Sequence, residues 1–214
     1  MNEGTEKDPR PAAVSFVTTE HFVLQGSRAW TITESTGRAS MFLTAVSGGL
    51  VALGLVATAS GIGSAFYAFA LILLPTLAFV GLVTFERALQ SGIEDYGYAR
   101  RIALLRGFYF DRAPEVTAYL LTVPEAERVR VQGLGGGRWQ GFRTVAGMVG
   151  VITCVLFGST IGLAVAVAFD HELALSLMAG GVSTLAALAA VMRFQTAAWR
   201  DAAAAPISFE ETAG

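Results

Sequence analysis

Long uncharged stretches alternate with charged ones along this chain. Residues 39–85 are 47 consecutive residues without a charged side chain, and residues 144–169 and 173–192 form two further runs of this kind. Backbone N–H and C=O groups inside a bilayer must bond within their own segment, so apolar runs of this length predict helices. About 20 helical residues cross the hydrocarbon core of a bilayer. The pattern therefore predicts an all-α membrane protein.

The longest uncharged run is predicted to contain two helices. One helix over residues 39–85 would be about 70 Å long at 1.5 Å per residue, more than twice the hydrocarbon thickness. The stretch SGIGS at 60–64 places two glycines and two serines together near the middle of the run. Glycine adopts positive φ without steric cost, and serine hydroxyls can bond backbone groups at helix ends. We therefore predict spans at 39–60 and 64–85, joined by a tight turn.

The C-terminal part repeats this layout, with Asp-His-Glu at 170–172 between its two uncharged runs. The predicted fold class is thus a polytopic membrane protein with four transmembrane helices in two hairpins, and a cytoplasmic helical segment between them. Its expected parts are an N-terminal tail with a juxtamembrane helix (1–38), the first hairpin (39–85), a helical segment with a glycine-rich linker (86–143), the second hairpin (144–192) and a C-terminal tail (193–214).

Basic residues predict the orientation of the chain. Four lie in residues 1–38, nine in 86–143 and two in 193–214, whereas the short connections at 61–63 and 170–172 contain none. Cytoplasmic loops of membrane proteins carry the excess of Lys and Arg, so both termini and the central segment are predicted to be cytoplasmic. No apolar segment follows a basic N-terminus, so the first span is expected to act as the insertion signal.

Composition agrees with a chain that is partly solvated by lipid. Hydrophobic residues make up 53% and charged residues 15%, against roughly 25% charged residues in soluble domains. The formal net charge of −2 gives no reason to expect nucleic acid as a partner. Only one of the basic residues is a lysine, Lys7, and alanine, glycine and valine are abundant. This bias is typical of GC-rich bacterial genomes, so we expect the bacterial inner (cytoplasmic) membrane.

Two segments outside the spans are predicted to be helical. The segment that precedes the first span is expected to be a helix running toward the membrane, with Gly26 and Gly37 as candidate bends. After the second span, one apolar stripe at helical spacing ends near Gly92 and a second, shifted stripe begins near Gly97. The shift predicts a helix that bends or changes register there.

An arginine-rich segment lies before the third span. Residues 128–143, RVRVQGLGGGRWQGFR, contain four arginines and no acid. Each basic residue near the cytoplasmic leaflet gains roughly 1 kcal/mol from anionic lipid, and tryptophan favours the interface. We predict contact with anionic inner-leaflet headgroups for this set: Arg128, Arg130, Arg138, Trp139 and Arg143. Topology alone would also require arginines here, so they do not by themselves define a lipid pocket.

Small residues are frequent in the spans, and Gly158 and Gly162 form a GxxxG pair. Such pairs let helix backbones approach closely. We assign Gly158 and Gly162 to helix packing, either within the four-helix bundle or between copies of the chain in a homo-oligomer. The hydroxyls of the spans are expected to bond the carbonyl groups of their own helices.

No motif predicts catalysis, a cofactor or a metal. The glycine cluster at 133–137 lacks the Lys-Ser/Thr that ends a phosphate-binding loop. His171 lies between Asp170 and Glu172, and three consecutive residues on a tight turn cannot converge on one ion. The single cysteine, Cys154, lies in an apolar run, where a thiolate is disfavoured. We therefore expect no enzyme activity, no cofactor and no metal site.

The spans also argue against a proton-coupled carrier. They contain no Asp, Glu, Lys, Arg or His, and ion-coupled transport usually needs an ionisable group inside the membrane. A membrane enzyme would require titratable groups that converge at the cytoplasmic mouth, and the sequence offers a set for this: Glu34, Arg38, Glu86 and Arg87.

The stretch EHFVLQGSRAWTITESTGRASMFLTAVSGGLVALG at 20–54 resembles the opening of uncharacterised four-span membrane proteins of GC-rich bacteria. This resemblance implies the four-helix architecture and no activity. In layout, a membrane hairpin followed by a cytoplasmic helix is also similar to small bacterial membrane effectors, which normally carry a nucleotide-sensing domain. The predicted function is a non-enzymatic membrane scaffold or interaction protein that binds lipid or a cytoplasmic protein. The alternative is a homo-oligomeric pore or membrane effector.

Overall fold

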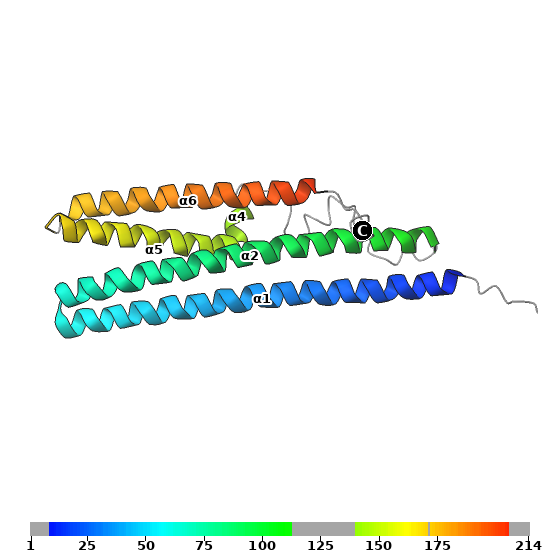
Figure 1. Ribbon diagram of the computed structural model, residues 1–214, viewed down its shortest axis with the longest axis horizontal. Coiled ribbons are helices and arrows are strands. Elements are labelled where there is room, and N and C mark those ends of the chain that lie inside the picture. Colours follow the sequence, from blue (N-terminus) through cyan, green and yellow to red (C-terminus); the bar gives the residue numbers. More distant parts are fainter. Residues whose placement is uncertain (1–8, 113–139, 171, 206–214) are drawn as a thin grey trace, which may run out of the picture. The chain divides into compact units, whose positions relative to one another are not determined.

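The computed structural model describes residues 9–112, 140–170 and 172–205, and every regular element in these ranges is helical (Figure 1). Four of the helices are long and apolar enough to cross a membrane. The elements are α1 (Pro9–Ser60), α2 (Ser64–Arg112), α4 (Gln140–Arg143), α5 (Val145–Ala168) and α6 (Leu173–Ala204).

The break between α1 and α2 falls at the SGIGS stretch. The Ser60 hydroxyl donates to the Val56 carbonyl at 2.8 Å, which satisfies an acceptor in the last turn of α1. Gly61 then adopts a φ of +69°, a conformation that side chains with a Cβ rarely tolerate. Helix α2 begins at Ser64, and its first turn includes a bond from Tyr67 N to the Gly63 carbonyl at 3.1 Å. The positive φ of Gly61 and the helix ends at Ser60 and Ser64 thus agree with the turn predicted for this stretch.

Helices α1 and α2 continue far beyond the uncharged run, with 52 and 49 residues. Gly26 and Gly37, the candidate bends, lie within α1 and do not interrupt it. A glycine inside a helix costs about 1 kcal/mol, a cost that packed neighbours can offset. Leu24 and Thr31, on either side of Gly26, are buried.

The described residues belong to two compact units, one with 9–32 and 94–112, the other with 33–93 and 140–205. The shift between the two apolar stripes of α2 coincides with the boundary between these units. Ile93 packs against the core of the second unit, whereas Ile102 is buried in the first. The two apolar stripes of α2 therefore pack in different units along one helix.

Aromatic rings and glycines from all four long helices meet in the core of the second unit. Phe42 of α1, Phe85 of α2 and Val149 of α5 are each only 2% exposed. A Cβ added at Gly81 of α2 would meet the Phe42 ring at 2.8 Å and the Thr153 hydroxyl. One added at Gly150 of α5 would lie 3.1 Å from the Phe85 ring and 3.0 Å from Val191 of α6. At Gly81 and Gly150, glycine thus leaves the space that a large core side chain of a neighbouring helix occupies.

Helices α5 and α6 approach closely through three glycines. A Cβ added at Gly158 would meet the Gly180 carbonyl at 2.6 Å and the Thr184 hydroxyl. One added at Gly162 would lie 2.9 Å from the Ser176 carbonyl, and one at Gly180 would lie 3.0 Å from the Gly158 carbonyl. Because these neighbours are mostly backbone, they cannot move aside as a side chain could.

The close approach of α5 and α6 predicts that the same substitution lowers stability at Gly180 but not at the adjacent Gly181 of α6. We expect Gly180→Val to lower the stability by about 1–3 kcal/mol, the usual cost of overpacking, because its side chain would press on the α5 backbone. Gly181→Val is the matched control, since no atom lies within 4 Å of a Cβ there. Thermal unfolding of the purified protein in mild detergent measures both. Equal midpoints for the two variants would contradict the close crossing.

Candidate functional site

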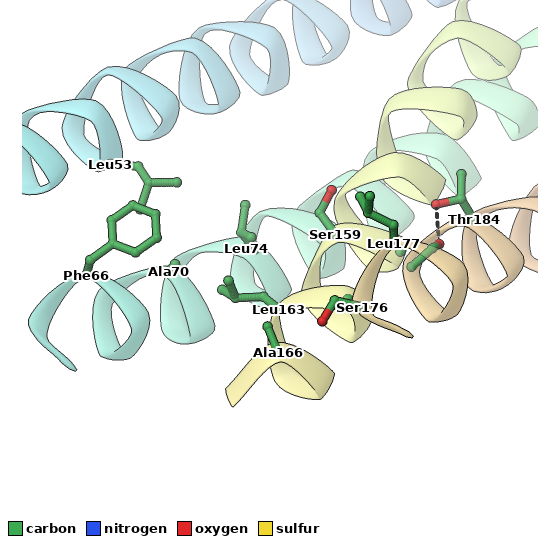
Figure 2. Close-up of a pocket in the computed structure, with 14 residues that line it drawn as sticks. Leu53, Phe66, Ala70, Leu74, Ser159, Leu163, Ala166, Ser176, Leu177 and Thr184 are labelled. Carbon is green, nitrogen blue, oxygen red and sulfur yellow. Dashed lines mark hydrogen bonds between the residues drawn. The ribbon is translucent and has the colours of Figure 1, made fainter. Parts of the chain in front are cut away.

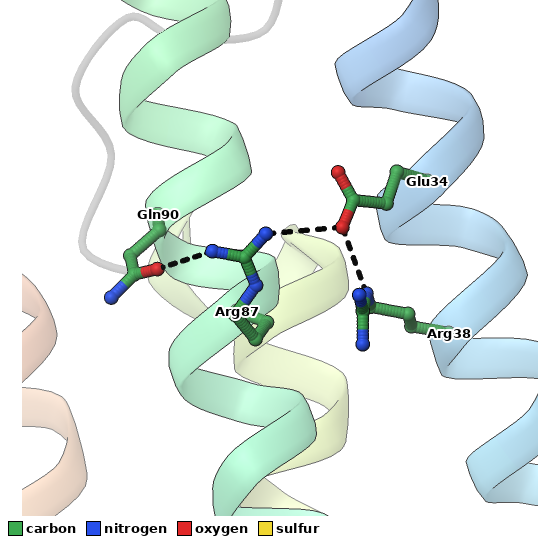
Figure 3. A network of polar contacts seen from close by, with 4 residues as sticks. All are labelled: Glu34, Arg38, Arg87 and Gln90. Carbon is green, nitrogen blue, oxygen red and sulfur yellow. Dashed lines mark hydrogen bonds and ion pairs between the residues drawn. The ribbon is translucent and has the colours of Figure 1, made fainter.

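Polar side chains of α1 and α2 meet in the second unit and form a cluster of four residues: Glu34, Arg38, Arg87 and Gln90 (Figure 3). We call it the Glu34 cluster. Arg38 Nε donates to Glu34 Oε1 at 2.9 Å within α1. Arg87 Nη2 of α2 donates to the same oxygen at 3.1 Å, and Arg87 Nη1 donates to Gln90 Oε1 at 2.9 Å. One carboxylate oxygen thus receives two guanidinium groups from two helices.

The position of the Glu34 cluster follows from the charge pattern of the chain. Arg38 is the residue before the uncharged run 39–85, and Arg87 lies two residues after it. A guanidinium group is strongly disfavoured in hydrocarbon, so it lies just beyond the apolar run. The cluster therefore marks the limit of the uncharged part of both α1 and α2, near the middle of each helix.

Glu34 is a hydrogen-bond acceptor rather than a proton donor. The hydrogen bond from Arg38, followed by that from Arg87, holds the pKa of the Glu34 carboxyl below its ordinary value. The carboxylate therefore stays ionised at neutral pH and ties α1 to α2. A general acid needs the opposite shift, toward the working pH.

The four residues that the sequence offers for a membrane enzyme are only partly brought together. They are Glu34, Arg38, Glu86 and Arg87. Glu34, Arg38 and Arg87 are in contact, and Glu86 joins them through Gln90, whose Nε2 donates to Glu86 Oε1 at 3.3 Å. Among the described residues, no group of three or more His, Cys, Asp or Glu could hold a metal ion. The arrangement is that of an ion-pair tie between helices.

An open, apolar pocket of about 470 Å³ lies between the long helices of the second unit (Figure 2). Its walls include Leu53 of α1, Phe66 and Leu74 of α2, Leu163 of α5 and Leu177 of α6. A second pocket of about 430 Å³ is lined mainly by α2, α5 and α6, with Phe79, Phe157 and Val191 among its residues. Such linings suit hydrocarbon rather than a polar solute.

The hydroxyls near these pockets are engaged with their own helices. Ser176 Oγ donates to the Glu172 carbonyl at 2.8 Å, and Thr184 Oγ1 donates to the Gly180 carbonyl at 2.9 Å. The same bonding is found in the other helices of the second unit: Thr44 to Ser40, Thr58 to Leu55, Thr153 to Val149 and Thr160 to Leu156. The expectation that these hydroxyls bond their own helices is confirmed for these residues.

The predicted lipid-contact set lies almost entirely outside the described residues. The members that are not described are Arg128, Arg130, Arg138 and Trp139. His171, from the predicted turn at 170–172, also lies outside the described residues. Arg143 is described and exposed, at the end of the short helix α4. Thr144 follows it as the N-cap of α5, and its hydroxyl accepts from Gly147 N at 3.0 Å.

Sequence reasoning missed a polar contact at the far end of α6. The uncharged run ends at residue 192, and α6 continues beyond it to Ala204 and buries Gln195, which is 1% exposed. Gln195 Nε2 donates to Thr144 Oγ1 at 3.2 Å. Trp199 lies farther along α6, with its ring 3.4 Å from a Cβ added at Gly92 of α2. The spacing of Val191, Gln195 and Trp199 on one helical face is the signal that could have predicted this.

Arg28 of α1 and Asp95 of α2 form a second ion pair, in the first unit. Arg28 Nε donates to Asp95 Oδ1 at 2.6 Å and Arg28 Nη2 donates to Oδ2 at 3.3 Å. The two side chains are 25% and 14% exposed, so the pair is partly sheltered from water. Bidentate arginine–carboxylate pairs of this kind fix the register of two helices.

No protein-family model, no curated protein and no solved structure matches this chain.

The Glu34 cluster predicts a pH-dependent contribution to stability. A carboxyl whose pKa is lowered by folding stabilises the folded state above its unfolded pKa, and this contribution is lost as the pH falls through the lower folded value. For Glu34 the ordinary value is 4.5. We therefore expect Glu34→Gln to lower the thermal midpoint at pH 7, and this difference from the parent protein to be lost as the pH falls through the folded pKa of Glu34, which lies below 4.5.

Glu86→Gln is the matched control, since the described partner of Glu86 in the cluster is the neutral amide of Gln90. Its effect at pH 7 should be smaller than that of Glu34→Gln, because charge-assisted hydrogen bonds are stronger than neutral ones. A Glu34→Gln effect that persists unchanged at low pH would show that the carboxylate charge is not involved.

Proposed function

We propose that the chain is a multi-pass protein of the bacterial inner membrane that acts as a non-enzymatic scaffold or interaction protein. In this proposal the spans form two hairpins, and both termini and residues 86–143 are cytoplasmic. The distribution of basic residues supports this orientation, since all fifteen lie outside the uncharged runs and outside the two short connections.

The length of α1 and α2 is the observation that carries the proposal. A bilayer needs about 20 helical residues, yet these helices have 52 and 49. Residues 9–38 of α1 and 86–112 of α2 are therefore left for a task outside the hydrocarbon. A protein whose only role was to cross the membrane would not need them.

Contacts inside the first unit support a folded extension. Leu24 of α1 and Ile102 of α2 are buried, at 6% and 7% exposure. The Arg28–Asp95 ion pair adds a partly sheltered polar contact. Such a helix pair has a defined surface, which is what a scaffold presents to a partner.

The alternative is a homo-oligomeric pore or membrane effector. Gly48 and Gly54 of α1 favour it, since both are exposed and nothing lies within 4 Å of a Cβ at either. The Gly158–Gly162 pair does not add to this support, because it faces Gly180 of the same chain. We place the scaffold first because hydroxyls that could line a pore, such as those of Thr153, Thr160 and Thr184, donate to carbonyl groups of their own helices.

Reporter fusions test the proposed orientation. Alkaline phosphatase is active only after export, so a fusion within residues 132–138 should be inactive and one at Ile62 should be active. A green fluorescent protein fusion at each site should give the reverse result. An active phosphatase at 132–138 would overturn the orientation.

Liposome measurements separate the scaffold from the pore. Purified protein reconstituted into dye-loaded vesicles should leave them as tight as protein-free vesicles. An added membrane channel is the positive control for leakage. Leakage that rises with protein density would favour the pore and contradict the scaffold.

A further inference from the structure

An exposed, uncharged stripe runs along α1 with a spacing of alternately three and four residues. All of its members are exposed, and none is charged. In chain order they are Phe16, Thr19, Val23, Gly26, Trp30, Thr33, Gly37, Ser40, Thr44, Ser47, Val51, Gly54 and Thr58. We call this set the α1 stripe. Its mean spacing of 3.5 residues, sustained over about six heptads, is the spacing of a coiled-coil seam.

The stripe changes character where the charged residues end. Before Arg38 it carries large apolar groups, and Phe16, Val23 and Trp30 are 73%, 55% and 70% exposed. From Ser40 onward it is built mainly of small residues. Water favours the burial of large apolar groups, whereas helices in lipid associate through small residues that allow close approach. The aromatic members thus lie only in the part before Arg38, and the part from Ser40 onward has mostly small residues.

The buried residues of α1 lie on a different face. Leu24, Thr31, Ser35, Phe42 and Val46 are all less than 9% exposed, and none belongs to the α1 stripe. Nothing lies within 4 Å of a Cβ added at Gly26, Gly37 or Gly54. At these three positions of the stripe, no described residue of a neighbouring helix is in packing contact.

We propose that the α1 stripe is the interface of a parallel homodimer, in which it packs against the α1 stripe of a second copy. This deepens the proposed function and rests on its membrane orientation. Lipid can cover only the part of the stripe within the bilayer, and a soluble protein only the part outside it. One occupant that matches both parts must itself be a transmembrane helix that continues beyond the bilayer. The α1 helix of another copy has this length and this pattern.

The geometry of such a dimer agrees with the neutrality of the stripe. Two copies inserted in the same orientation are related by a two-fold axis along the membrane normal, so each stripe residue faces its own counterpart. A charged residue there would face a like charge. Instead, Gly26, Ala29 and Thr33 surround Trp30 on the helix surface and leave room for the partner's indole.

The length and the aromatic members of the stripe are compatible with a stable dimer. Six heptads extend about 63 Å along the helix at 1.5 Å per residue. Stable interfaces bury about 800 Å² per partner. Aromatic side chains bury about 150 Å² or more each, so Phe16 and Trp30 supply a substantial part before the remaining positions are counted.

Cysteine cross-linking in native membranes tests this interface. In a Cys154→Ser background, we expect Thr19→Cys, Thr33→Cys and Ser40→Cys each to form a disulfide-linked dimer on mild oxidation. A disulfide needs Cα atoms within about 7 Å of each other. Gln25→Cys and Ile32→Cys are the controls, since both positions are exposed but lie on another face of α1. They should stay monomeric.

The mass of the product identifies the occupant of the stripe. The dimer should migrate at twice 22.5 kDa. An adduct of another mass would show a different protein on the stripe, and equal cross-linking at stripe and control positions would show random collision. Either result, or no cross-linking at the stripe, would overturn the proposal.

Charge insertion provides an independent test. Trp30→Glu places like charges opposite each other across the two-fold axis, so the native mass in mild detergent should fall from dimer to monomer. Ile32→Glu adds the same charge two residues away and should leave the dimer intact. The reporter fusions report orientation whether or not the dimer forms, so loss of the dimer alone would leave the proposed orientation standing. A dimer retained by Trp30→Glu would refute the stripe as the interface.

Discussion

Hydrocarbon solvates neither a charge nor an open peptide group, and most features of this chain follow from that constraint. Backbone groups must bond within each helix, so apolar runs become helices. Charged side chains are kept outside the uncharged run 39–85, and at its two ends Arg38 and Arg87 share the Glu34 carboxylate. The hydroxyls that remain within the runs turn to carbonyls of their own helices, as Thr153 does to Val149. The polar chemistry of the second unit is thereby concentrated beyond the ends of the apolar runs.

Without water between them, helices in lipid gain from close contact rather than from burial of apolar area. Glycine has two opposite roles here. At Gly81, Gly150 and Gly158 it admits a side chain or backbone of a neighbouring helix to within about 3 Å of a Cβ position. At Gly48 and Gly54 the same residue type meets nothing within 4 Å. Sequence alone does not separate these roles, because both kinds of glycine lie in equally apolar surroundings.

The elements could be predicted from the sequence, since each depends on local composition and length. The uncharged runs predict four apolar helices, and SGIGS predicts the break between α1 and α2. The contacts between helices were harder to predict from the sequence, because they join residues far apart in the chain. Arg28 and Asp95 are 67 residues apart, and Gln195 and Thr144 are 51 apart. The full length of α6 was not predicted either, since the helix continues past the end of the uncharged run, through Arg193 and Arg200, to Ala204.

Helices α1 and α2 each contribute residues to both compact units. The surroundings of each helix face therefore change along its length. Along α2 the apolar stripe shifts near Ile93, where the second unit's core gives way to the first. Along α1 the exposed stripe keeps its spacing through the same region, and its aromatic members, Phe16 and Trp30, lie only before Arg38. A buried face adapts its register to two different cores, whereas the exposed stripe keeps one spacing, as the proposed dimer requires. That contrast is why we base the proposed dimer on the exposed face of α1 rather than on the pockets or the Glu34 cluster.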